Sequence, residues 1–147
     1  SVADVVDRFI KIIKPSKIYF GNKDMQQLKI MEDFIKKNHP MTKVVGCKTV
    51  REVTGIAYSS RNLLLSKKEK SIASNVYKLI LINKKKLINN KNFVKLIKLK
   101  ILKFGVKKID YLKIININRI VKPYKTKNEY KIFVAYFLGS TRLIDNI

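Results

Sequence analysis

The chain of 147 residues has one cysteine, few acidic residues and no long uncharged apolar run. Because a single thiol cannot form an internal disulfide, Cys47 fits a reducing compartment, and we expect a cytoplasmic protein. A membrane-spanning helix needs roughly twenty consecutive apolar residues, so we expect no membrane partner. No signal-peptide pattern opens the chain, and no metal-ligand spacing occurs in it. The chain begins without methionine inside a predicted helix, so we expect a processed or truncated protein.

Acidic residues are scarce: ten Asp and Glu stand against 33 Lys and Arg, which gives a formal net charge of +23 at pH 7. Lysine supplies nearly all of this charge, whereas nucleic-acid-binding surfaces favour arginine and stacking aromatics. The lysines are spread along the chain beside Asn and Ile, as in residues 82–92. All three residue types have AT-rich codons, so we interpret the excess as codon drift and expect no nucleic-acid partner. A basic, non-enzymatic nucleic-acid-binding module is the alternative.

The first fifty residues alternate helix and strand. Apolar periodicity and breaker residues predict a helix over 1–14, a strand over 17–20, a helix through 28–35 that stops near residue 38, and a strand over 43–47. This order, with short apolar strands, is typical of a parallel sheet covered by helices. Two strands are too few for a stable parallel sheet. Residues 1–50 are therefore expected to be the last strand–helix–strand part of a Rossmann-like nucleotide-binding domain.

Residues 51–147 have a different character and predict a smaller α+β domain. Ser66 and Glu69 form a capping-box pattern at the start of one long helix over 66–87, and a second helix over 92–104 ends at Gly105. The β-branched and aromatic runs 109–117 and 130–138 predict strands of an antiparallel sheet. The fold class is thus α/β followed by a small α+β domain.

The segment Tyr19–Leu28 carries the first candidate site, because it turns from a strand into a helix. Open α/β sheets bind ligands at the carboxyl ends of their strands, where Lys23 could neutralise phosphate charge. Asp24 could accept hydrogen bonds from a ribose, or act only as a helix N-cap. Gln26 and Gln27 point to different helix faces, and Gln27 is the better ligand candidate beside Lys23. For Lys23 itself, a solvated surface lysine remains the alternative.

The segment Ser59–Asn62 carries the second candidate site. Two hydroxyls and the guanidinium of Arg61 in series can hold several phosphate oxygens at a helix start. An ordinary N-cap with a surface arginine is the alternative.

Three other polar features of the sequence receive structural interpretations. Arg51 and Glu52 are interpreted as a simple ion pair. His39 has no carboxylate or nucleophile nearby in sequence and is expected to be a structural loop residue. Cys47 is expected to be a buried strand residue.

Five segments together resemble the pantothenate synthetase (pantoate–β-alanine ligase) family. They are Lys14-Pro15, Tyr19–Leu28, Thr49–Glu52, Gly55–Asn62 and Thr141–Asn146. The resemblance covers the whole chain but only about the last half of the usual enzyme. It implies that pantoate is activated by ATP to a pantoyl-adenylate with release of pyrophosphate, and that β-alanine then displaces AMP to give pantothenate. The implied fold is that of a nucleotidyltransferase related to class I aminoacyl-tRNA synthetases.

The resemblance also implies roles for single residues. The implied ATP-binding residues are Gly21, Asn22, Lys23, Asp24, Val50, Tyr58, Ser59, Ser60 and Arg61. Gln27 matches a glutamine that holds pantoate, while Lys23 and Arg61 are the implied catalytic residues, which neutralise the polyphosphate with Mg²⁺. Asn22 replaces the family's usual Glu, and Tyr58 replaces its usual Met.

The family's His-x-Gly-His signature and a second pantoate-binding glutamine belong to its N-terminal half and do not occur in this sequence. The resemblance therefore implies a missing N-terminal half as partner, and it further implies a homodimer. We expect that this chain in isolation cannot form pantoyl-adenylate. A truncated remnant that folds but binds nothing is a further alternative.

Overall fold

The computed structural model describes residues 1–147 and divides them into two compact units. The first unit contains residues 1–48 and 117–128, and the second contains residues 49–116 and 129–147. Each unit has its own hydrophobic core and is described by itself. The domain boundary at residue 50 that the sequence suggests stays a prediction.

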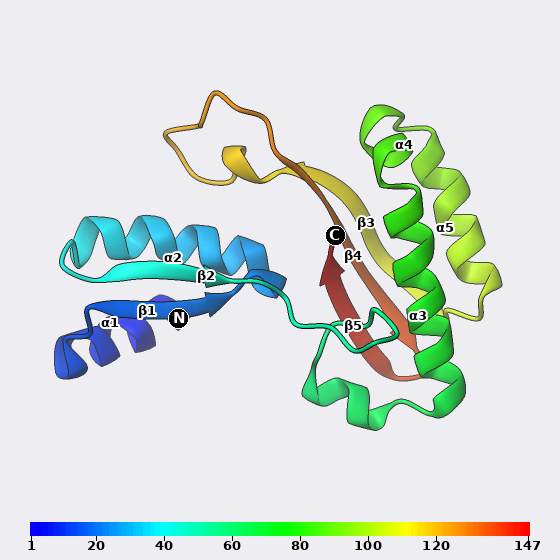
Figure 1. The fold of residues 1–147 in the computed structure, drawn as a ribbon, viewed down its shortest axis with the longest axis horizontal. Coiled ribbons are helices and arrows are strands. Elements are labelled where there is room, and N and C mark those ends of the chain that lie inside the picture. The colour runs from blue at the N-terminus through cyan, green and yellow to red at the C-terminus, as the bar shows by residue number, and fades with distance from the viewer. The chain divides into compact units, whose positions relative to one another are not determined.

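The first unit alternates helix and strand, as expected (Figure 1). Its elements are α1 (Val2–Ile13), β1 (Lys17–Gly21), the 3₁₀ turn η1 (Asn22–Asp24), α2 (Met25–Asn38), β2 (Lys43–Cys47) and the 3₁₀ turn η3 (Ile117–Arg119). The two strands pair in parallel, with Ile18 opposite Val44. Pro15 has no backbone N–H and follows Lys14, whose left-handed conformation ends α1.

One face of this small sheet carries the core of the first unit. Side chains alternate along a strand, so Ile18, Phe20 and Val44 face the helices. They pack against four buried residues from both helices, which are Val6, Ile10, Met31 and Ile35. On the opposite face, Tyr19 is 62% exposed.

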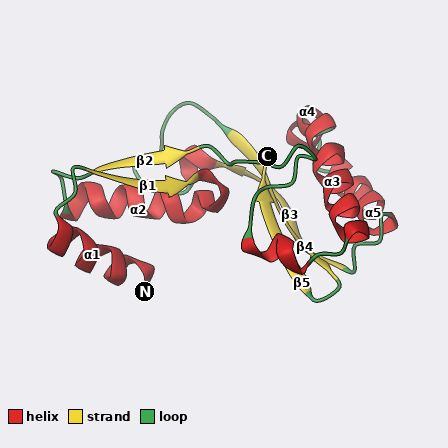
Figure 2. Cartoon of the chain, turned by 60° about the horizontal axis from the view of Figure 1, so that its bottom comes forward, coloured by secondary structure: helices red, strands yellow, loops and turns green.

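The second unit packs three helices on a three-stranded antiparallel sheet of order β3-β4-β5 (Figure 2). Its elements are the 3₁₀ turn η2 (Ser60–Leu64), α3 (Lys67–Ile82), α4 (Lys84–Asn89), α5 (Phe93–Lys103), β3 (Lys108–Asn116), β4 (Tyr130–Leu138) and β5 (Thr141–Asn146). The predicted capping box of Ser66 and Glu69 and the antiparallel pairing of β3 with β4 are confirmed. Ile80, Ile97 and Ile101 from the helices meet Ile132 and Val134 from β4 in its core.

The prediction of one helix over 66–87 is wrong, because the helix breaks at Asn83. The backbone of Asn83 has φ −95° and ψ 8°. Its side-chain amide donates to the carbonyl oxygen of Leu79 at 2.8 Å, the oxygen that also accepts its backbone N–H. Such local side-chain bonds compete with helical continuation. The chain restarts as α4 and still buries Leu87.

Strand β5 was not predicted from the sequence. Gly139 and Ser140 separate it from β4, and Gly139 has φ +55°, which favours glycine. A two-residue Gly-Ser link between β-rich runs is a hairpin signal that was present in the sequence. The charged residues Arg142 and Asp145 interrupt the alternation of apolar and polar residues in this short strand, so its pattern is weak. No helix of either unit is long and apolar enough to cross a membrane.

Truncation of Ile80 tests the core of the second unit. Ile80 is fully buried, so Ile80→Ala should lower the free energy of unfolding by about 2–5 kcal/mol. Ile82 on the same helix is 81% exposed, and Ile82→Ala should change it by less than about 0.5 kcal/mol. Urea unfolding followed by circular dichroism measures both, and equal losses would contradict the burial described.

Candidate functional site

The Lys23 segment lies at the carboxyl end of β1. Gly21 is the last residue of the strand, and Asn22–Asp24 form η1 before α2 begins at Met25. Asp24 occupies the N-cap position of α2, but its side chain makes no capping hydrogen bond and is exposed. A capping role therefore does not account for its carboxylate. The position is the strand edge at which parallel α/β sheets bind ligands.

Gly46 on β2 shapes the same edge and was not among the residues predicted for the site. A β-carbon at Gly46 would lie 2.7 Å from Oδ1 of Asn22 and 3.1 Å from a methyl group of Leu28. Glycine thus allows the side chain of Asn22 to lie over the end of β2. An isolated glycine within a strand is a sequence signal for such a close approach.

The two glutamines of α2 border a single cavity of about 390 Å³. Its lining consists of Ser1, Val2, Ala3, Gln26, Gln27, Ile30 and Met31. Neighbouring helical residues differ by about 100° in direction, which still allows both side chains to reach one wide opening. Lys23 does not line this cavity, so the expectation that at most one glutamine faces a ligand beside Lys23, with Gln27 the better candidate, stays a prediction.

The Ser59–Asn62 segment forms a 3₁₀ turn rather than the start of an α-helix. Ser59 is the N-cap of η2, and its hydroxyl accepts the backbone N–H of Arg61 at 3.3 Å. Ser60 and Arg61 are exposed. The capping alternative is thus realised for Ser59, while the other two side chains remain accessible. With only five residues, η2 adds little helix dipole for binding an anion.

Asn62 is buried beneath this turn. Its side-chain N–H group donates to the carbonyl oxygen of Ala57 and to Oε1 of Glu52, both at 3.1 Å. Its own Oδ1 is buried without a hydrogen-bond partner. The amide of Asn62 therefore connects the backbone at Ala57 with the carboxylate of Glu52. Glu52 is not paired with Arg51, contrary to the prediction from the sequence.

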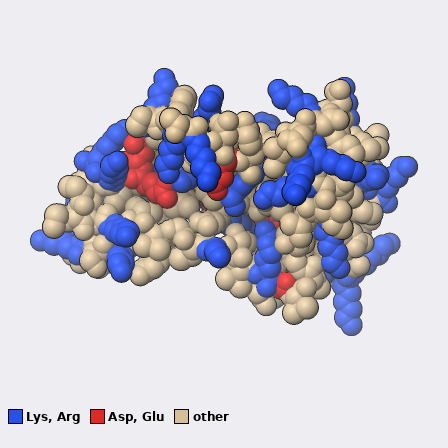
Figure 3. Space-filling view, turned by 45° about the horizontal axis from the view of Figure 1, so that its top comes forward, with Lys and Arg blue, Asp and Glu red and all other residues tan.

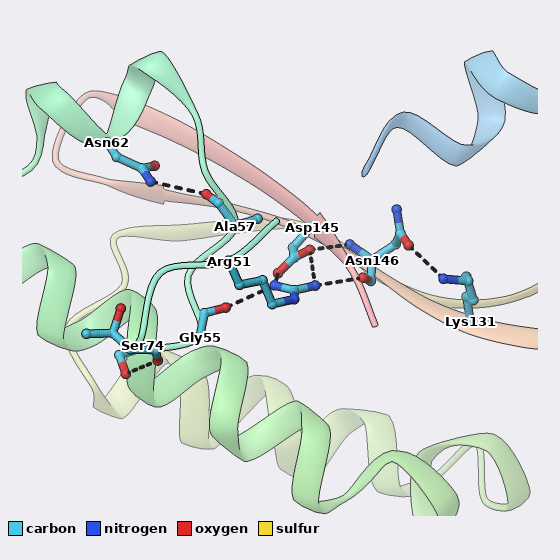
Figure 4. Close-up of polar contacts among 9 residues, drawn as sticks. Arg51, Gly55, Ala57, Asn62, Ser74, Lys131, Asp145 and Asn146 are labelled. Atoms are coloured by element: carbon cyan, nitrogen blue, oxygen red, sulfur yellow. Dashed lines mark hydrogen bonds and ion pairs between the residues drawn. The ribbon is translucent and has the colours of Figure 1, made fainter. Parts of the chain in front are cut away.

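Arg51 instead pairs with Asp145, 94 residues further along the chain (Figure 4). Its two terminal nitrogens donate to the two carboxylate oxygens at 2.6 and 2.9 Å. Its guanidinium lies 4.4 Å from the ring centre of Tyr77. Burial alone would lower the pKa of Arg51, but the hydrogen bonds and charge of Asp145 outweigh burial and raise it. The predicted Arg51–Glu52 ion pair is wrong, and no local signal indicated Asp145.

The candidate residues thus fall into two groups, one in each unit. The first unit holds Gly21, Asn22, Lys23, Asp24 and Gln27, whereas the second holds Val50, Tyr58, Ser59, Ser60 and Arg61. Within the second group, the backbone N–H of Tyr58 donates to the carbonyl oxygen of Val50 at 3.0 Å. No group of three or more His, Cys, Asp or Glu side chains lies close enough to hold a metal ion.

His39 lies at the other end of the first unit's sheet, close to the start of β2. Its Nε2 is 2.7 Å from Oδ1 of Asp7, a carboxylate that the sequence does not place near it. Lys11 contacts the other oxygen of Asp7 at 2.6 Å. Lys11, followed by His39, holds the pKa of Asp7 below its ordinary value. The pair links α1 to the end of α2.

Cys47 is exposed, so the prediction of a buried strand residue is wrong. Alternation along β2 places Cys47 with Val45, on the sheet face opposite to the helices. The strand assignment itself is confirmed.

Comparison with known proteins shows the family of this chain. The family model for pantoate-beta-alanine ligase matches residues 1–147. The chain belongs to the pantoate–β-alanine ligase family. It is 38% identical to the pantothenate synthetase of Aquifex aeolicus over 150 residues, which cover 99% of this chain and 53% of that protein. The match to the enzyme of Clostridioides difficile is 36% identical and covers 97% of this chain and 52% of the relative.

Solved structures of the family show the same fold. The pantothenate synthetase of Thermus thermophilus is 30% identical, with a TM-score of 0.81, and the match covers 99% of this chain and 54% of that chain. The enzyme of Francisella tularensis, complexed with β,γ ATP and β-alanine, is 29% identical with a TM-score of 0.73, over 99% of this chain and 48% of that chain. The chain thus spans about half the length of these relatives and corresponds to their C-terminal half. The α/β class and the antiparallel α+β part are confirmed.

The Asp7 contacts predict an acid-dependent stability. An aspartate whose folded pKa is lowered stabilises the fold above its unfolded pKa, about 3.9, and loses this effect as pH falls through the folded pKa. Asp7→Asn should therefore lower the free energy of unfolding at pH 7 and flatten its decline as the pH falls below about 5. His39→Gln should have the smaller effect, because Lys11 is the larger cause of the shift. Urea unfolding across this pH range measures both, and an unchanged slope for Asp7→Asn would contradict the assignment.

Proposed function

We propose that this chain carries the ATP- and pantoate-binding part of a pantoate–β-alanine ligase. The complete enzyme would activate pantoate with ATP to a pantoyl-adenylate, release pyrophosphate, and transfer the pantoyl group to the amine of β-alanine with release of AMP. The observation that carries the proposal is the position of Lys23 and Asp24 at the carboxyl end of β1 in a chain of this family. The complex of the Francisella tularensis relative with ATP and β-alanine supports the substrates.

The residues of this chain would work by positioning and by electrostatics. Lys23 and Arg61 would neutralise the polyphosphate, and the exposed hydroxyl of Ser60 could donate to a phosphate oxygen. Gln27 would orient the pantoate carboxylate for in-line attack on the α-phosphorus. The remaining proposed ATP contacts are Gly21, Asn22, Asp24, Val50, Tyr58 and Ser59.

Mg²⁺ belongs to this proposal through ATP. Magnesium is usually held by substrate phosphates, waters and one or two carboxylates rather than by a protein cage. The donor set fits this mode, because the exposed carboxylate of Asp24 stands near Lys23 in sequence and no cluster of metal-ligating side chains is present. Bound to ATP, the ion would neutralise phosphate charge.

The partners in this proposal are the family's N-terminal half and a second copy of the enzyme. A sheet of two parallel strands leaves both edges open, and such small sheets need further strands. Helix α1 also exposes Val5, Phe9 and Ile12, each more than half accessible, beside its buried face. The N-terminal half would supply strands and the His-x-Gly-His segment. Homodimer formation and a cytoplasmic location stay predictions.

The alternative of a basic, non-enzymatic nucleic-acid-binding module rests on one tract, and the family comparisons do not support it. Residues 70–109 contain twelve lysines and no acidic residue. In the face drawn in Figure 3, however, lysine and arginine side chains are scattered over the surface and do not gather in one stripe. Codon drift accounts for such a distribution without a ligand.

Substitution of Lys23 separates these functions. Lys23→Ala should weaken ATP binding roughly 10- to 150-fold, because one charge-assisted phosphate contact is worth about 1.5–3 kcal/mol. It should leave DNA-duplex binding nearly unchanged. Lys17→Ala, at the other end of the same strand, is the matched control and should bind ATP like the unaltered chain. Titration with a fluorescent ATP analogue measures the affinities, and equal binding by both variants would contradict the proposed site.

The reaction itself should require the family's N-terminal half. The 147-residue chain should release no pyrophosphate from ATP and pantoate, because it has no His-x-Gly-His segment. A coupled pyrophosphate assay, with the full-length Aquifex aeolicus relative as positive control, measures this. Pyrophosphate release by this chain would show that its own residues suffice. Absence of ATP binding even with an added N-terminal half would favour an inactive remnant.

A further inference from the structure

The segment that leads to Ser59–Arg61 folds into a short backbone turn. Arg51 and Ala57 form an isolated antiparallel bridge. The backbone N–H of Glu52 donates to the carbonyl oxygen of Ile56, and that of Gly55 donates to the carbonyl oxygen of Glu52, both at 2.8 Å. The turn 50–58 therefore places Val50 beside Tyr58, immediately before the proposed phosphate contacts.

Arg51 ties this turn to the last strand of the chain. In addition to its two bonds with Asp145, it donates to the carbonyl oxygens of Gly55 at 3.0 Å and Asn146 at 3.2 Å (Figure 4). All four bonds leave from the two terminal nitrogens. The planar guanidinium fork suits this geometry, and the single ammonium of a lysine cannot reproduce it.

Tyr77 of α3 forms the second support of the turn. Its ring lies under the guanidinium of Arg51 and also against Gly55, where a β-carbon would approach the ring to 2.2 Å. Gly55 has φ +92°, so glycine is required there for its conformation as well as for space. Ser74, also on α3, donates to the carbonyl oxygen of Thr54 at 2.7 Å. Helix α3 and strand β5 therefore both hold the turn 50–58.

The second unit contains a comparable ion pair with no such connection. Arg142 donates to Asp110 at 2.6 Å and lies 5.9 Å from the ring centre of Tyr111. This pair joins β5 to β3 and touches no residue of the turn 50–58. Exposed pairs of this kind contribute little to stability. It therefore serves as a matched control.

We propose that Arg51 is a positioning residue for nucleotide binding: held by Asp145 and Tyr77, it fixes the turn 50–58 and thereby orients Ser59, Ser60 and Arg61 toward the phosphates. The inference rests on the proposed function, because it assumes that these three residues contact ATP. It adds Arg51, Asp145 and Tyr77 to the residues on which the site depends. None of the three is itself a proposed ATP contact.

The experiment compares Arg51→Lys and Asp145→Asn with the control Asp110→Asn in the 147-residue chain. Each variant is examined for thermal unfolding, for ATP affinity and for hydrogen exchange of the Tyr58 and Glu52 amides. Arg51→Lys keeps the charge and most of the side-chain volume, so it remains usable if Asp145→Asn unfolds. We expect both test variants to bind ATP at least about tenfold more weakly, since loss of one charge-assisted phosphate contact costs roughly tenfold or more in affinity.

The same two variants should also exchange the Tyr58 and Glu52 amides faster, whereas Asp110→Asn should match the unaltered chain in both measurements. Unchanged exchange and unchanged ATP affinity in Arg51→Lys would overturn the proposal, as would equal effects of Asp110→Asn. Faster exchange with unchanged affinity would also overturn it, because the turn would then be held for stability alone. If the unaltered chain binds no ATP even with an added N-terminal half, the proposed function fails, and the exchange data separately decide whether Arg51 holds the turn.

Discussion

The ion pair between Arg51 and Asp145 is the interaction on which the candidate site of the second unit depends. Removing two charges from water is costly, and a half-buried pair is favourable only when further hydrogen bonds and good geometry compensate. Arg51 meets both conditions through two parallel bonds to Asp145, two carbonyl oxygens and the face of Tyr77. Loss of either partner would leave an uncompensated charge beside the turn 50–58.

In the first unit, the corresponding constraint is the direction of the strands. Parallel pairing brings the carboxyl ends of β1 and β2 to one edge, where Gly46 lies opposite Phe20 and Cys47 opposite Gly21. Gly46 leaves space for Asn22, and η1 carries Lys23 and Asp24 at this edge. Cations and backbone N–H groups at such an edge can bind a polyphosphate, which is the role proposed for Lys23.

The high net charge bears on neither constraint. The two basic residues proposed to contact the polyphosphate, Lys23 and Arg61, are distinguished by their position at the end of β1 and in η2. The many other lysines lie largely on exposed faces of both units, where screening by salt weakens their mutual repulsion. The net charge therefore affects how the chain interacts with its surroundings. The fold determines which charged side chains lie close enough to bind one ligand together.

The sequence by itself determined the features that arise within a few residues. Apolar periodicity located α1, α2 and both parallel strands, and the pattern of Ser66 and Glu69 marked the start of α3, because these signals depend on neighbouring side chains. The segments around Lys23 and Ser59–Arg61 were also recognisable in the sequence as candidate phosphate-binding segments. Tertiary structure alone decided the pairing of Arg51 with Asp145, the contact of His39 with Asp7 and the exposure of Cys47. These features depend on how segments that are distant in the sequence pack together. Arg51 and Asp145, for example, lie 94 residues apart, and the burial and geometry that stabilise their pairing leave no local pattern in the sequence.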